Sequence, residues 1–160
     1  MTAYAAYWFL PAVIPIAIYV SWSDMSSMKI TNKSVMALVI AYAILGPYAF
    51  GLPMYLWQWL HLPVMLAVCI LLWAARVMGA GDAKFIAAAA PMLVVADLDL
   101  ILRVFAACLI ASLIVHRLAK YTPIRAQVPH WKSWEDKRFP KGLPLSMTLV
   151  FYLLLVAAYR

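Results

Sequence analysis

Residues 34–75 read SVMALVIAYAILGPYAFGLPMYLWQWLHLPVMLAVCILLWAA, a run of 42 residues without Lys, Arg, Asp or Glu. A continuous helix of this length would be about 63 Å long, about twice the ~30 Å hydrocarbon core of a bilayer. The sequences GP at 46–47 and GLP at 51–53 lie near the middle of the run and are typical of turns. The run therefore predicts two membrane-spanning helices, over about residues 34–50 and 54–76.

The rest of the chain shows the same apolar character. Further apolar runs cover residues 4–22, 85–96, 100–115 and 143–159, and 68% of the 160 residues are hydrophobic while 12% are charged. A soluble domain carries about a quarter charged residues. The sequence therefore predicts an all-α, polytopic integral membrane protein with about six transmembrane helices, forming one membrane-embedded domain over residues 1–160. The fourth run is the shortest, and a re-entrant segment is the alternative there.

The basic residues are distributed unequally between the two sides of the membrane. The chain has 13 Lys and Arg residues and a formal net charge of +7. With six spans, all of them except Arg103 and Arg160 fall on one side, which the positive-inside rule makes cytoplasmic. We therefore expect a protein of the cell (inner) membrane with both termini outside. Because topology accounts for the charge, we expect membrane lipids and no nucleic acid as partners.

The acidic residues are few, and two of them stand out by position. Asp24 and Asp82 lie at the cytoplasmic edges of the first and fourth spans, where an ionisable residue is costly and often functional. The other four are expected to be solvated: Asp97 and Asp99 in an outer turn, Glu135 and Asp136 in the long basic loop. Trp131 and Trp134 of that loop would suit the membrane interface.

Each of the two aspartates also has a simple structural explanation. Asp24 could be a hydrated loop residue, although at the end of a helix its charge would oppose the helix dipole. Asp82, in the sequence GAGDAK at 79–84, could be an N-cap, as could Asn32 before the second span. A phosphate-binding loop is excluded at 79–84 because the GxxxxGK[ST] pattern is absent.

Two facing carboxyl groups can hydrolyse a peptide bond without a metal or a nucleophilic side chain. The ionised carboxylate takes a proton from water, and the protonated one donates a proton to the substrate carbonyl. Cys69 and Cys108 lie inside apolar runs, and His61, His116 and His130 show no metal-ligand spacing. We therefore expect neither a metal nor another cofactor.

At these residues the sequence resembles the type IV prepilin peptidases, the GxGD aspartic membrane proteases. The sequence GAGDAK at 79–84 matches the GxGDxK element of that family at every defined position. Asp24, followed by Ile30 and Asn32, matches the segment that opens with the first family aspartate. Residues 143–147, LPLSM, resemble the family's Pro-Tyr-Gly stretch at the start of the last helix more loosely.

The resemblance implies roles for individual residues. Asp24 and Asp82 would be the catalytic pair of an aspartic endopeptidase, and Gly79 and Gly81 would shape the turn that presents Asp82. Lys84 would either steady the charge of Asp82 or anchor the chain to lipid headgroups.

The resemblance also implies a substrate. Family members cut the leader from prepilins or pseudopilins after a Gly, at the cytoplasmic face of the membrane, during pilus biogenesis. The chain is similar to short members that serve tight-adherence (Flp) pili and lack the N-terminal methyltransferase domain with its CxxC motifs, so methylation is not expected.

Three alternatives stay open at this point. The first is a small transporter or channel subunit that uses Asp24 and Asp82 to relay protons or ions. The second is an inactive homologue that scaffolds pilus assembly. The third is a peptidase of the same chemistry that acts on preflagellins.

Overall fold

The computed structural model describes residues 1–136 and 138–160, and within these residues all regular structure is helical. The elements in chain order are α1 (Ala3–Ser27), α2 (Asn32–Phe50), α3 (Leu52–Gln58), α4 (His61–Ala74), α5 (Ala80–Ala89), η1 (Ala90–Met92), η2 (Val95–Asp97), α6 (Leu98–Ala119), α7 (Ile124–Gln127), η3 (Lys132–Trp134) and α8 (Gly142–Tyr159). The all-helical class expected from the sequence is confirmed.

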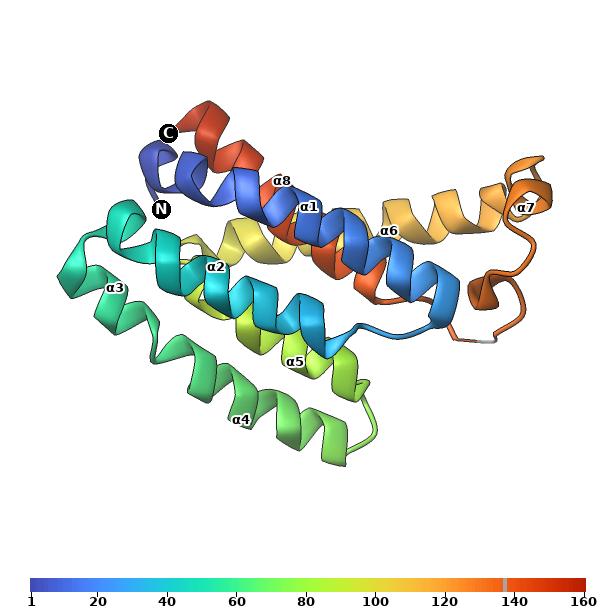
Figure 1. The fold of residues 1–160 in the computed structure, drawn as a ribbon, viewed down its shortest axis with the longest axis horizontal. Helices are drawn as coiled ribbons and strands as arrows, with labels where there is room; N and C mark the ends of the chain where they lie inside the picture. Colours follow the sequence, from blue (N-terminus) through green and yellow to red (C-terminus); the bar gives the residue numbers. More distant parts are fainter. Residues whose placement is uncertain (137) are drawn as a thin grey trace.

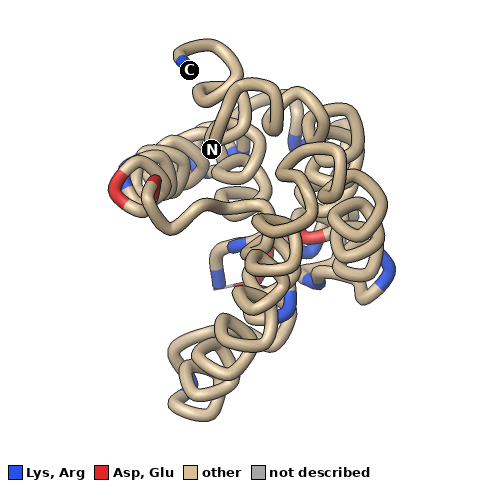
Figure 2. Tube along the Cα trace, turned by 90° about the vertical axis from the view of Figure 1, so that its left-hand side faces the viewer, with Lys and Arg blue, Asp and Glu red and all other residues tan. Residues whose placement is uncertain are grey.

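Five stretches of helix in the described chain are long and apolar enough to cross a membrane: α1, α2, α8, α3 with α4 taken together as Leu52–Ala74, and η2 with α6 taken together as Val95–Ala119. Many of their large apolar side chains face outward, as lipid-facing side chains do. In Figure 2 long stretches of the trace carry no charged residue. The expectation of about six spans is close to this result, and the difference lies in the fourth run.

The fourth crossing is made of short pieces. Helix α5 has ten residues, or about 15 Å, which is half the hydrocarbon core, and two 3₁₀ turns follow it. Its first turn lies beside the loop between α1 and α2, whereas Asp97 at the end of η2 contacts both Met1 and Arg160. The chain therefore passes from one end of the bundle to the other between α5 and η2, without one long helix.

Helix α1 packs most extensively against α8 and then α2, and in Figure 1 it runs alongside α8. Helix α4 packs on α5, and α6 packs on α8. Phe9 and Val13 of α1, Tyr42 of α2 and Tyr152 of α8 are fully buried in the shared core. The two chain termini lie at one end of the bundle, and the loops after α1, α4 and α6 lie at the other (Figure 1).

Asp97 links several parts of the chain at the end of the bundle that holds both termini. This side chain is 2% exposed, and its carboxylate accepts hydrogen bonds from the Met1 amino group at 2.7 Å, from Tyr152 Oη at 2.8 Å and from the Arg160 guanidinium. The expectation that Asp97 is solvated is therefore wrong, because its partners come from both ends of the chain. Asp99 is exposed as expected and pairs with Arg103 one turn along α6.

Tyr152→Phe is expected to lower the free energy of unfolding by about 1.5–3 kcal/mol, because it removes a hydrogen bond to a buried carboxylate. Thermal unfolding of the purified protein in detergent measures the change. Tyr159→Phe is the matched control, since Tyr159 lies on the same helix and is 82% exposed. Equal stability of the two variants would contradict a stabilising role for the Asp97 cluster.

Candidate active site

Asp24 lies in the last turn of α1, is 5% exposed, and is held by the start of α8. Its Oδ2 accepts a hydrogen bond of 2.6 Å from the backbone N–H of Gly142, the first residue of α8. The last turn of a helix disfavours a negative charge, while the first turn of a helix favours one. The N-terminus of α8 therefore offsets the unfavourable position of Asp24 on α1, and Asp24 is not a hydrated loop residue.

Gly142 is the functional candidate that the sequence analysis missed, one residue before the LPLSM segment at 143–147. A Cβ at Gly142 would lie 2.9 Å from both Cβ and Oδ2 of Asp24, closer than side chains pack. The sequence feature that could have identified Gly142 is its position at the start of the last span, in a chain with five glycines. Its partner lies 118 residues away, so local sequence could not supply the contact.

Asp82 lies in the first turn of α5, as its third residue, and the N-cap of that helix is Gly79. The N-cap explanation of Asp82 is therefore wrong, although the helix dipole still favours a negative charge there. Its Oδ2 lies 3.1 Å from the position of a Cβ on Gly79, so a glycine leaves room for the carboxylate to fold back. Burial raises the pKa of Asp82, while the Lys141 ammonium and the Gly79 N–H lower it.

The loop after α1, which follows Asp24, packs against the first turn of α5, which carries Asp82. Ile30 Cβ lies 3.3 Å from where a Cβ on Gly81 would be, so a glycine permits this close approach. Asn32 is the first residue of α2, and Thr31 is its N-cap, which corrects the expected cap by one position. The Asn32 amide oxygen accepts a hydrogen bond of 3.1 Å from Lys84 Nζ, so Lys84 ties α5 to α2.

These contacts bring all the candidate residues together at one end of the bundle. The carboxyl groups of Asp24 and Asp82 come from separate helices and are near enough for their charges to interact. The remaining candidates lie around this pair. Gly79 and Gly81 permit close approaches to Asp82 and Ile30, and Lys84 bonds to Asn32.

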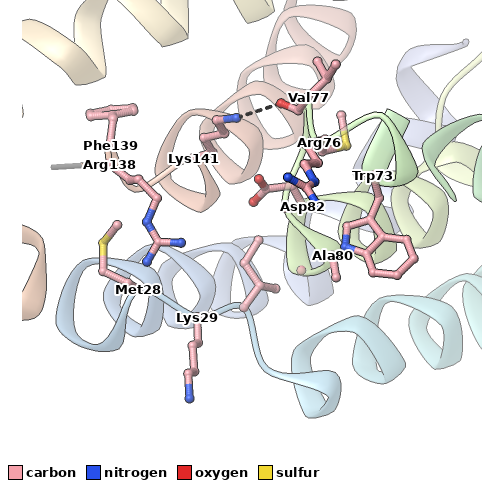
Figure 3. Close-up of a pocket in the computed structure, with 14 residues that line it drawn as sticks. Met28, Lys29, Trp73, Arg76, Val77, Ala80, Asp82, Arg138, Phe139 and Lys141 are labelled. Atoms are coloured by element: carbon pink, nitrogen blue, oxygen red, sulfur yellow. Dashed lines mark hydrogen bonds between the residues drawn. The ribbon is translucent and has the colours of Figure 1, made fainter. Parts of the chain in front are cut away.

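A cavity of about 590 Å³ opens beside Asp82 (Figure 3). Its walls are the loop after α1, the segment between α4 and α5, and the chain just before α8. Four basic residues contribute to the lining, namely Lys29, Arg76, Arg138 and Lys141. Such a space can admit an extended peptide segment to the carboxylate of Asp82.

The long loop after α6 forms part of this cavity and is itself packed. Trp134 is 2% exposed, its Nε1 donates to the Val128 carbonyl at 2.9 Å, and its ring stacks on His116 at a centroid distance of 5.1 Å. The expectation that Trp134 lies at the membrane interface is therefore wrong. Asp136, as expected, is at the surface, where it pairs with Arg138 at 3.0 Å.

No group of three or more His, Cys, Asp or Glu side chains able to hold a metal occurs among residues 1–136 and 138–160. The acidic groups that the structure brings to this end of the bundle beside the cavity are the carboxyls of Asp24 and Asp82. An all-helical, multi-pass membrane protein with paired carboxyl groups at one end of the bundle is the class that fold and site define.

Comparison with known proteins identifies the family. The model of the type IV leader peptidase family matches residues 12–116, more than half of the chain, and the match includes both Asp24 and Asp82. The chain belongs to this family of membrane peptidases, as the sequence motifs indicated. No curated protein and no solved structure matches it.

Gly142→Ala is expected to reduce leader-peptide cleavage about tenfold or more, because the added methyl group would displace the Asp24 side chain or the start of α8. Cleavage per folded molecule, measured in detergent with a leader-bearing pilin, tests this. Gly46→Ala is the matched control: its Cβ would meet the Tyr55 ring at 2.6 Å, in another part of the fold. Both variants are expected to lose a similar amount of stability, but only Gly142→Ala should lose cleavage. Unchanged cleavage by Gly142→Ala would contradict the role of this glycine.

Proposed function

We propose that the protein is an aspartic-type endopeptidase that removes the leader from type IV-like prepilins, with those of tight-adherence (Flp) pili as its substrates. The observation that carries the proposal is the placement of Asp24 and Asp82. Two helices distant in sequence bring these carboxyl groups to the same end of the bundle, next to a cavity. The family to which the chain belongs supports cleavage of leader peptides.

Two carboxyls can carry the whole reaction. The ionised one takes a proton from water while the water oxygen attacks the scissile carbonyl carbon, and the protonated one donates its proton to the carbonyl oxygen. In the second step the resulting diol loses a hydroxyl proton to the second carboxylate, the C–N bond breaks, and the first carboxyl protonates the leaving nitrogen. The products are a carboxylic acid and an amine, and both aspartates return to their starting states.

The proposed place of cleavage is the cytoplasmic face of the cell membrane. The loops at the end that holds Asp24 and Asp82 carry Lys29, Arg76 and Lys141, and a basic loop is favoured on the cytoplasmic side. A leader that ends where an apolar helix begins would place its scissile bond at this boundary. Prepilins or pseudopilins and the surrounding lipids are therefore the proposed partners, and both termini would face outward.

Asp24→Asn and Asp82→Asn are each expected to lower prepilin cleavage at least about 100-fold, the usual contribution of general acid–base groups. An amide keeps the size of the carboxyl, and its oxygen can still accept the Gly142 N–H bond, so insertion should be preserved. Incubation of each purified variant with a prepilin, followed by separation of the shortened product, measures the effect.

The controls for this experiment separate the chemistry from folding and from metals. Asp99→Asn changes an exposed carboxylate far from the cavity and should cleave normally. Cleavage by the unmodified protein should survive a metal chelator. Substantial cleavage by either Asp24→Asn or Asp82→Asn would rule out the catalytic pair, and transport of ions without any cleavage would favour a transporter or channel subunit.

The orientation can be tested with single cysteines and a membrane-impermeant thiol reagent in intact cells. A cysteine at the exposed Ala126 should be protected, and one at Leu52, which is 65% exposed, should be labelled. The unmodified protein supplies the background, since Cys69 and Cys108 are both buried. The reverse pattern would put the aspartates outside and would contradict cleavage on the cytoplasmic face.

A further inference from the structure

The two residues before and at the start of α8 lie near both members of the aspartate pair. The backbone N–H of Gly142 donates to Asp24 Oδ2 at 2.6 Å, while the side chain of the preceding residue, Lys141, lines the cavity together with Asp82. Lys141 Nζ donates to the Val77 carbonyl at 3.4 Å, which directs the ammonium group toward the segment that carries Asp82 (Figure 3). One short stretch of chain thus bonds to Asp24 and places a cation in the cavity that Asp82 lines.

The two carboxyl groups have unequal surroundings. Asp24 is buried, is not part of the cavity wall, and accepts its bond from a neutral backbone N–H. Asp82 forms part of the wall of a cavity lined by four basic residues. A desolvated site disfavours a negative charge, while nearby cations favour one. A negative charge is therefore more stable on Asp82 than on Asp24.

The charged groups around Asp82 do not contribute equally. Arg138 pairs with Asp136, Lys29 points away from Asp82, and Lys84 is bonded to Asn32. Arg76 also lines the cavity and is exposed to solvent, which weakens the effect of its charge. Lys141 is the cation that lowers the pKa of Asp82 against the effect of burial, and its backbone is fixed by the neighbouring Gly142 bond.

We propose that Lys141 is a positioning residue that keeps Asp82 ionised, so that Asp82 is the general base and Asp24 the general acid. This inference rests on the proposed function. Asp82 then takes the proton from the attacking water, and Asp24 gives its proton to the carbonyl oxygen. On breakdown, Asp82 returns the proton to the leaving nitrogen, and Asp24 recovers one from the diol. The Gly142 bond uses Oδ2 of Asp24, which leaves Oδ1 to carry the acidic proton.

The pH dependence of kcat/KM tests this assignment, because its acidic limb reports the ionisation of the general base in the free enzyme. Without the ammonium of Lys141, Asp82 binds a proton more readily. In Lys141→Met the acidic limb should move to higher pH by about half a unit to one unit, the lower end of the effect of a nearby charge. Lys141→Arg should keep the limb of the unmodified protein.

The control is Lys33→Met, which removes one positive charge from an exposed residue that does not line the cavity, and it should leave the limb in place. If Lys141→Met does not insert, Lys141→Gln replaces it. A limb that does not move when the charge at 141 is lost, or that moves equally in Lys141→Arg, overturns the inference. Those results leave the proposed function intact, whereas failure of the unmodified protein to cleave any prepilin overturns the proposed function itself.

Discussion

The hydrogen bond from the Gly142 N–H to Asp24 is the contact on which the site depends. It joins the last turn of α1 to the first turn of α8, the pair of helices with the most extensive packing in the described chain. A carboxylate at the end of α1 would be unfavourable alone, because the carbonyl end of a helix repels negative charge. The unpaired N–H groups at the start of α8 remove that cost, and a residue larger than glycine would not permit the approach.

The same two helices are fastened at their opposite ends by Asp97, which contacts Met1 beside the start of α1 and both Tyr152 and Arg160 of the α8 region. Asp97 and Asp24 are both buried, but their surroundings differ. Asp97 is surrounded by two cations and a phenol, which hold it ionised and inert. Asp24 is equally buried but has a neutral donor and another carboxyl as neighbours. A buried carboxyl in such surroundings can change protonation state, as acid–base chemistry requires.

Much of this arrangement could be predicted from the sequence, because membrane crossings are set by local composition. The uncharged run 34–75 gave the hairpin of α2 with α3 and α4, and the basic loops indicated that Asp24 and Asp82 share one end. What could not be predicted are contacts between residues far apart in the chain. Gly142 meets Asp24 across 118 positions and Asp97 meets Tyr152 across 55. Neither contact has a local signature, and the buried Trp134 was misjudged because tertiary packing overrides the usual preference of tryptophan for the interface.

Helix α5 is too short to cross the membrane alone, yet its packing holds Asp82 in place. Ala83 and residues 87–90 are buried alanines, and such small residues let neighbouring helices approach closely in a membrane. Helix α4 packs along α5, and Lys84 and Gly81 fasten its first turn to α2 and to Ile30. The two carboxyls therefore stand on packed helices, whereas the chain at 138–141 on the other side of the cavity is a loop. In the proposed mechanism, this division puts fixed geometry at the proton-transferring carboxyls and a loop where the peptide would enter, so differences between substrates should be recognised by the loop and not by the helices.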